Sequence, residues 1–157
     1  QNPLCESCNF ADSCVALEKK IIKELPVKLK KTKVRNRYFN FLVAVTGNGK
    51  TILNERKGKG IWQGLYQFPL IETKKSIDCI ELISNEEFVG FFPNEITTSV
   101  FNNKEIIHKL SHQHIYTKFW IVKTEILSEA NINWMDVNKY PVPVLIANFL
   151  KAFNPKN

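Results

Sequence analysis

Short apolar runs separated by polar turns fill the chain from residue 38 onward, which is typical of a domain built on a β-sheet. Residues 38–45 are aromatic and β-branched, and Thr46-Gly47-Asn48-Gly49 follows them directly. This order predicts a buried strand, a tight turn and a returning strand over residues 51–55. Further strands are expected in three ranges, 96–101, 105–110 and 115–125.

Helical patterns flank these strands. Residues 76–89 carry an uneven amphipathic pattern, and residues 143–150 begin with a proline, which favours the first turn of a helix. A third helical run covers residues 15–22, before the strands. Residues 61–69 are rich in aromatic side chains, and we interpret them as a buried strand. Strands with flanking helices indicate the α+β class with a mixed sheet.

Composition narrows the class of protein. The chain has 157 residues, of which 44% are hydrophobic, enough to bury the core of one domain of ordinary size. No apolar run approaches the roughly 20 residues of a membrane-spanning helix, and the first residues lack the features of a secretory signal. We therefore expect no membrane partner and a cytoplasmic location. Because the chain opens on Gln1, we expect it to be a piece of a longer protein.

The net charge of +7 is concentrated in one stretch. Residues 19–37 hold nine Lys and Arg against one acidic residue, whereas residues 38–157 hold thirteen against eleven. From Pro26 this stretch has no apolar periodicity, so we expect an extended linker over residues 25–37. It is either a solvated connection or a segment that follows the phosphates of a nucleic acid.

Three cysteines stand close together near the start, spaced as Cys5-x2-Cys8-x5-Cys14. Thiolates are ligands for zinc or an iron–sulfur cluster, and both centres usually take four protein ligands. A fourth thiolate preceding Gln1 would complete such a site, and a chance group of free cysteines is the alternative. We interpret the distant Cys79 as a buried, inert thiol.

All three histidines lie within residues 108–114, which read His-Lys-Leu-Ser-His-Gln-His. They could form a metal site, although no carboxylate falls within this stretch. Strand alternation places His112 and His114 on one face, and Ser111 and Gln113 on the other. A serine hydroxyl both donates and accepts hydrogen bonds, which suits a planar ligand rich in heteroatoms. The residues alone leave both interpretations open.

Taken in this order, the motifs resemble the C-terminal part of the MutY-type adenine DNA glycosylases, which remove adenine mispaired with 8-oxoguanine. That family has a [4Fe–4S] loop of spacing Cys-x6-Cys-x2-Cys-x5-Cys, and Cys5, Cys8 and Cys14 match its last three ligands. Its linker contains proline and basic residues, as residues 25–37 do. Residues 62–69, Trp-Gln-Gly-Leu-Tyr-Gln-Phe-Pro, are similar to a Gly-Leu-Trp-x-Phe-Pro signature that the family shares with MutT/Nudix proteins.

The lesion-recognition turn of the family reads His-x-Phe-Ser-His-x-His, and residues 108–114 match it with leucine in place of phenylalanine. The resemblance implies that three residues contact 8-oxoguanine, namely Leu110, Ser111 and His112. It also implies that four basic residues follow the DNA backbone, namely Lys28, Lys30, Lys31 and Arg37. A working Nudix hydrolase needs an Arg-Glu-x-x-Glu-Glu helix for Mg²⁺, and residues 80–87 lack that motif.

The resemblance further implies three segments: a remnant of the iron–sulfur loop over residues 1–24, the basic linker over 25–37, and a Nudix-like lesion-recognition domain over 38–157. The expected partners are double-stranded DNA with 8-oxoguanine opposite adenine and the N-terminal catalytic domain of the same chain. The parent protein is an enzyme that holds the [4Fe–4S] cluster, whereas this part holds no catalytic residue and three of the four thiolates. The alternatives are a Nudix-type nucleoside diphosphate hydrolase and a zinc-binding interaction module.

Overall fold

The computed structural model describes residues 3–27, 33–92, 96–125 and 127–155, and it divides the chain into two units, residues 1–33 and 34–157. The first unit holds only short helices, none of which contains a buried residue. These are η1 (Cys5–Ser7), η2 (Ala11–Ser13), α1 (Val15–Glu18) and η3 (Ile22–Glu24). The helix expected over residues 15–22 ends early, and Lys20 adopts a positive φ of 57° that a continuous helix does not allow.

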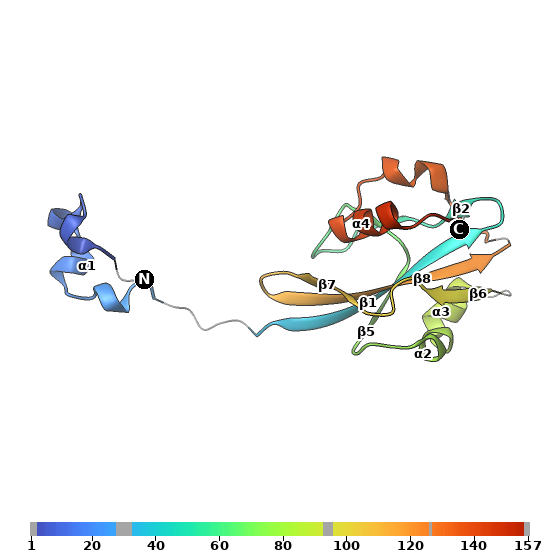
Figure 1. Ribbon diagram of the computed structural model, residues 1–157, viewed down its shortest axis with the longest axis horizontal. Helices are drawn as coiled ribbons and strands as arrows, with labels where there is room; N and C mark the ends of the chain where they lie inside the picture. Colours follow the sequence, from blue (N-terminus) through green and yellow to red (C-terminus); the bar gives the residue numbers. More distant parts are fainter. Residues whose placement is uncertain (1–2, 28–32, 93–95, 126, 156–157) are drawn as a thin grey trace. The chain divides into compact units, whose positions relative to one another are not determined.

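The second unit is built on a five-stranded mixed sheet (Figure 1). Its two long strands, β1 (Arg35–Thr46) and β8 (Gln113–Thr124), run parallel over twelve residue pairs. The strand order is β5-β1-β8-β6, and β7 also pairs with β8. The shorter strands are antiparallel to their partners: β5 (Leu70–Thr73), β6 (Thr97–Val100) and β7 (Ile106–Lys109). The expected α+β class with a mixed sheet is confirmed.

The prediction that residues 51–55 form a returning strand next to residues 38–45 is wrong. Instead, two pairs of two-residue strands form outside the main sheet, β2 (Lys50–Thr51) with β9 (Ile132–Asn133) and β3 (Asn54–Glu55) with β4 (Tyr66–Gln67). Both edges of β1 are occupied, one by β8 and the other by β5, which leaves no edge for the returning chain. β1 also begins three residues before the expected strand, so residues 35–37 belong to the sheet.

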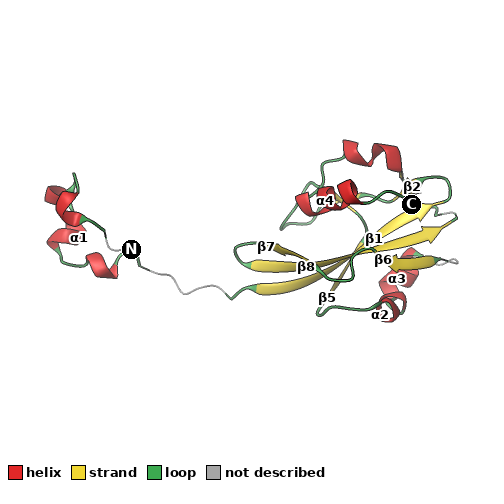
Figure 2. Ribbon diagram, in the orientation of Figure 1, coloured by secondary structure: helices red, strands yellow, loops and turns green. Residues whose placement is uncertain are grey.

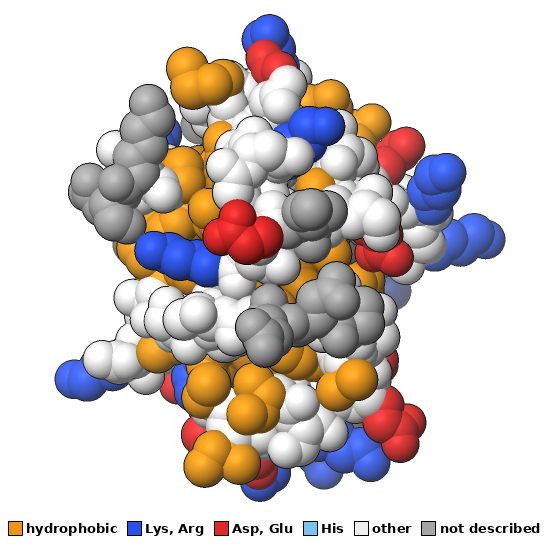
Figure 3. Space-filling model, turned by 90° about the vertical axis from the view of Figure 1, so that its right-hand side faces the viewer, with side chains coloured by type: hydrophobic (Ala, Val, Ile, Leu, Met, Phe, Trp, Pro, Cys, Tyr) orange, Lys and Arg blue, Asp and Glu red, His pale blue; other side chains and the backbone are white. Residues whose placement is uncertain are grey.

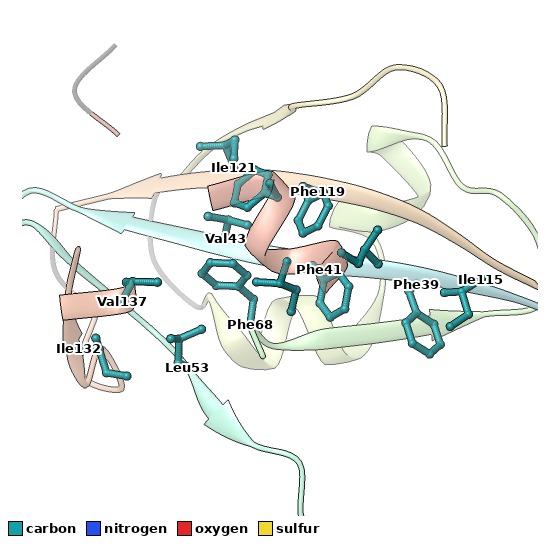
Figure 4. Packing of buried hydrophobic residues seen from close by; sticks show 13 residues of the cluster. Phe39, Phe41, Val43, Leu53, Phe68, Ile115, Phe119, Ile121, Ile132 and Val137 are labelled. Carbon is teal, nitrogen blue, oxygen red and sulfur yellow. The ribbon is translucent and has the colours of Figure 1, made fainter. Parts of the chain in front are cut away.

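Helices cover both faces of the sheet (Figures 1 and 2). On one face α4 (Val144–Ala152) packs on the side chains of alternate β1 residues, and the buried cluster there combines phenylalanine with aliphatic side chains (Figure 4). Within it the ring of Phe119 stacks on that of Phe149, with centroids 4.2 Å apart. On the other face α2 (Cys79–Ile83) and α3 (Glu86–Phe91) contribute to a second cluster. The apolar run of β1 is therefore buried on both sides.

The single helix expected over residues 76–89 is broken in two by its own capping residues. The Asp78 side chain accepts from the Glu81 amide in a capping box, and the Asn85 side chain accepts from the amides of Glu87 and Phe88. Because a capping residue takes extended backbone angles, Asn85 ends one helix as it begins the next. Cys79 was expected to be buried, but it is exposed.

The helix η4 (Trp134–Lys139) was not expected from the sequence pattern. It follows β9 directly and adds the buried Val137 to the cluster under α4. No helix in the described residues is long and apolar enough to cross a membrane.

Candidate functional site

The hairpin formed by β7 and β8 carries the serine and histidines that the sequence singles out. The Leu110 amide donates to the carbonyl of Gln113 at 2.8 Å and closes a two-residue turn made of Ser111 and His112. Both turn residues are exposed. The His112 carbonyl accepts from the Arg35 amide at 3.1 Å, which ties the turn to the first residue of β1. The expected strand alternation at Ser111 and His112 is wrong, because these two residues form the tip of a turn.

Hydrogen-bonding groups gather at this tip. Ser111 Oγ lies 3.0 Å from His112 Nδ1, so one of the two groups donates to the other according to the imidazole tautomer. Where Nδ1 accepts, the serine hydrogen points at the imidazole and the Oγ lone pairs remain free to accept from a ligand. No bond to another described residue takes up the amide of Ser111 or that of His112. The tip therefore offers amide donors beside an acceptor oxygen.

Residues on either side of the tip anchor it in the domain. Leu110 is half-buried and packs against the cluster under α4, and Gln113 is 7% exposed. Gln113 Oε1 accepts from Arg37 Nη1 at 3.3 Å. The same guanidinium donates to both carboxylate oxygens of Glu72, at 2.7 and 2.5 Å, and lies over the ring of Phe39. Arg37 is thus engaged inside the sheet, and its contact with DNA stays a prediction.

The charges around Arg37 are unbalanced. Hydrogen bonds from Arg37 hold the pKa of Glu72 below its usual range, and Arg35 and Arg56 act in the same direction. Burial lowers the pKa of Arg56, and the nearby charge of Arg37 adds to this effect. Arg56 Nη1 donates to Gln67 Oε1 at 3.0 Å. Because several guanidinium groups share one carboxylate, an excess of positive charge remains beside the hairpin.

A ten-residue loop, residues 56–65, joins β3 to β4 and packs against the hairpin. Its ends are held by two hydrogen bonds, from the Arg56 amide to the Leu65 carbonyl and from the Gly64 amide to the Arg56 carbonyl, both 2.9 Å. Trp62 is half-buried, has a φ of 61°, and lies 5.8 Å from the ring of His108. The strand expected over residues 61–69 is therefore a loop and a two-residue strand, although its apolar residues do pack on the core.

The candidate metal ligands are not brought together in the described residues. Cys5 and Cys14 are half-buried, and Cys8 is exposed. Neither the cysteines nor the histidines form a group of three or more metal-ligating side chains in the described residues. These side chains as placed do not fit a cluster, so the [4Fe–4S] centre stays a prediction. Three of the predicted DNA contacts lie outside the described residues, namely Lys28, Lys30 and Lys31.

The carboxylates of α2 and α3 also form no metal-ligating group in the described part of the chain. Glu81 Oε1 accepts from Lys75 Nζ at 2.6 Å, and its other oxygen accepts from the Asp78 amide. Glu86 and Glu87 are exposed in the first turn of α3. These side chains support the helices, and their positions do not suggest a site for a divalent cation.

A family model described as the NUDIX domain matches residues 40–152, which cover the sheet and its helices. The chain therefore belongs to the NUDIX domain family.

One solved structure shares this fold. The MutT protein from Methanosarcina mazei Go1 superposes with a TM-score of 0.57 at 10% identity, covering 83% of this chain and 99% of that one. The E. coli ORF135 protein gives a TM-score of 0.45 at 16% identity, covering 76% of this chain and 89% of that one. At 10% identity the likeness to the MutT protein shows the Nudix-like fold and nothing of the substrate.

Proposed function

We propose that this chain is the 8-oxoguanine-recognition part of an adenine DNA glycosylase, which binds the damaged base while another domain removes the adenine opposite it. The observation that carries the proposal is the exposed turn of Ser111 and His112 at the tip of the hairpin, with a hydroxyl, an imidazole and two amides that bond to no other described residue. The proposal also rests on the resemblance of residues 108–114 to the lesion-recognition turn of those enzymes.

The chemistry of the lesion matches these groups. Guanine presents an acceptor at N7, whereas 8-oxoguanine presents a donor at N7 and an acceptor at the C8 oxygen. Ser111 Oγ accepts from N7–H when its own hydrogen points at His112 Nδ1, and a turn amide donates to the C8 oxygen. The same arrangement faces the N7 of guanine with a second acceptor, so the turn distinguishes the two bases.

His112 and Leu110 have supporting roles in this proposal. The imidazole of His112 sets the direction of the serine hydrogen, and so sets which of the two bases is accepted. Leu110 is half-buried beside the turn, where the resembled family has phenylalanine. Its smaller side chain leaves less surface for contact with a base. Arg37 donates to Gln113 behind the turn and is itself held by Glu72. These contacts limit the movement of the turn.

The proposed partners are a DNA duplex with 8-oxoguanine opposite adenine and a catalytic domain that extrudes the adenine from the stack. We assign no catalytic step to the residues of this chain. Cys5, Cys8 and Cys14 carry no part of the binding argument, because they are not assembled in the structure.

A nucleotide hydrolase is the second candidate, and membership of the NUDIX domain family favours it. Hydrolysis of a nucleoside diphosphate bond in this fold needs several carboxylates that hold a divalent cation on the phosphates. In the described residues no such group is present, and the acidic side chains of α2 serve as helix caps and ion-pair partners. These observations favour the binding function.

The two candidates are separated by two measurements on the purified chain. The first is equilibrium binding to three duplexes of one sequence, with 8-oxoguanine·adenine, guanine·adenine or guanine·cytosine at the centre. The second is release of phosphate or nucleoside monophosphate from nucleoside diphosphate compounds with Mg²⁺. We expect tightest binding to the lesion duplex and no hydrolysis. Equal binding to all three duplexes together with Mg²⁺-dependent turnover would establish the hydrolase instead.

A further inference from the structure

Positive charge is gathered at one end of the second unit, around the hairpin tip and the loop 56–65. Eight charged residues lie there, six basic and two acidic. The basic ones are Arg35, Arg37, Arg56, Lys57, Lys59 and Lys109, and the acidic ones are Glu55 and Glu72. Elsewhere in the described part of this unit the charges balance, eight basic against eight acidic. Figure 3 shows the opposite end, where both acidic and basic side chains are scattered among hydrophobic and uncharged ones.

Three of these cations are free to meet a ligand. Lys57, Lys59 and Lys109 are exposed, and none of them forms an ion pair with another described residue. Arg35 is also largely exposed, with its side chain 74% accessible and only a 4.0 Å approach to Glu72. Exposed cations without partners keep their full attraction for an anion in solution.

The loop that carries two of the lysines is firmly attached beside the hairpin. Its ends are bonded to each other through Arg56, Gly64 and Leu65, as described above. Its tryptophan, Trp62, lies 5.8 Å from His108 of β7 and 6.0 Å from Phe39 of β1, measured between ring centroids. Lys57 and Lys59 therefore belong to a loop that packs beside the hairpin whose tip is Ser111 and His112.

We propose that the loop 56–65 is a phosphate-binding site, in which Lys57 and Lys59 hold the DNA backbone beside the base that the hairpin tip contacts. The inference rests on the proposed function for the identity of the duplex. A base read at the tip brings its neighbouring phosphates to the cations around the tip, because phosphates follow the strand on both sides of every base. These contacts are independent of sequence and of the lesion.

The test compares two double variants of the full chain that lose the same charge. Lys57→Ala/Lys59→Ala removes the loop cations, and Lys123→Ala/Lys151→Ala removes two exposed lysines, one near the end of β8 and one in α4. Binding is measured by fluorescence anisotropy at several salt concentrations, with the lesion duplex and with an undamaged duplex of the same sequence. Vesicles of anionic phospholipid serve as a second polyanion, and circular dichroism checks the fold.

We expect the loop variant to lose affinity for both duplexes by the same factor, more than about tenfold at about 0.1 M salt. The slope of log K against log salt should become shallower by about 2, since each phosphate contact contributes about 0.9. The control variant should bind like the wild type. Equal losses in both variants, or no loss in the loop variant, would overturn the proposal. An equal loss of vesicle binding would also overturn it, by showing a general polyanion surface.

The test of the phosphate-binding site can be distinguished from the test of lesion recognition. Ser111→Ala should leave the salt slope unchanged, because the serine hydroxyl carries no charge. If Ser111→Ala leaves the lesion preference unchanged while the loop variant loses affinity for DNA, the phosphate site stands and the proposed function fails. If the lesion preference depends on Ser111 while the loop variant binds like the wild type, the reverse holds.

Discussion

Replacing Glu72 with glutamine tests whether the ion pair with Arg37 stabilises the hairpin end of the sheet. The carboxylate accepts two hydrogen bonds from one guanidinium, at 2.7 and 2.5 Å, and that guanidinium also reaches Gln113. The Arg37 side chain is 15% exposed and that of Glu72 is 35% exposed. Glutamine keeps the size of the side chain and one acceptor oxygen, but it removes the charge and the second acceptor.

The expected cost of this change is modest. Exposed ion pairs contribute about 0.2–1 kcal/mol to the free energy of unfolding, and bidentate pairs between arginine and a carboxylate lie at the upper end of that range. Solvent screens Glu72 in part, so we expect Glu72→Gln to lower the free energy of unfolding by about 1 kcal/mol at neutral pH. The matched control is Glu129→Gln, since Glu129 is exposed and forms no ion pair with a described residue. It should change stability by less than about 0.5 kcal/mol.

The pH dependence gives the sign of the effect. Arg37 lowers the pKa of Glu72 in the folded protein. The pair therefore contributes its full stability at pH values above the ordinary carboxyl pKa of 4.5. This contribution is lost as the pH falls through the lower pKa of the folded state. Urea unfolding of wild type and variant should therefore differ at neutral pH and converge in acid. A difference that stays constant down to strongly acidic pH, or that equals the effect of Glu129→Gln, would refute the assignment.

Two further substitutions test the packing and the caps. Asp78→Ala removes the side chain that accepts from the Glu81 amide, and it should destabilise the fold by about 1 kcal/mol in urea unfolding, whereas Ser84→Ala in the adjoining turn should have a smaller effect. Thr117→Val replaces a fully buried hydroxyl that has no hydrogen-bond partner among the described residues, so the melting temperature should rise or stay constant. A loss of several degrees would show that this hydroxyl has a partner in solution.

The long strands were predictable from the sequence because each contains a continuous run of mostly apolar residues. Apart from Asn40, the run over 38–45 is apolar on both faces, as the two clusters on either side of β1 require. The two-residue strands β2, β3, β4 and β9 have no such signal, because their pairing depends on the path of the rest of the chain. The split of the expected helix over 76–89 had a signal in Asp78 and Asn85, which are both strong capping residues.

The candidate site was only partly predictable. Ser111 and His112 were found through their resemblance to a known turn, but the bond between them and their place at the tip needed the structure. The pairing of Arg37 with Glu72 joins residues 35 positions apart, for which a single sequence gives no signal. Placing Arg37 in a linker followed from the run of basic residues before it, whereas its alternation with Phe39 places it in the strand.

The position of the loop 56–65 was not predictable either, because it depends on contacts between residues that are far apart in the sequence. Its lysines stand in a polar stretch that is typical of an ordinary connection, and the contacts of Trp62 with His108 and Phe39 place the loop beside the hairpin.

The central claim is that Ser111 recognises 8-oxoguanine, and the most direct test is the ratio of two dissociation constants, for the guanine·adenine duplex over the 8-oxoguanine·adenine duplex. The ratio is measured for wild type, Ser111→Ala and the control Ser128→Ala, whose serine is exposed in a turn outside the hairpin. One hydrogen bond contributes about 1 kcal/mol, so Ser111→Ala should reduce the ratio about fivefold while the control keeps the wild-type value. A ratio that is the same in wild type and Ser111→Ala would contradict the claim, whatever happened to the absolute affinities.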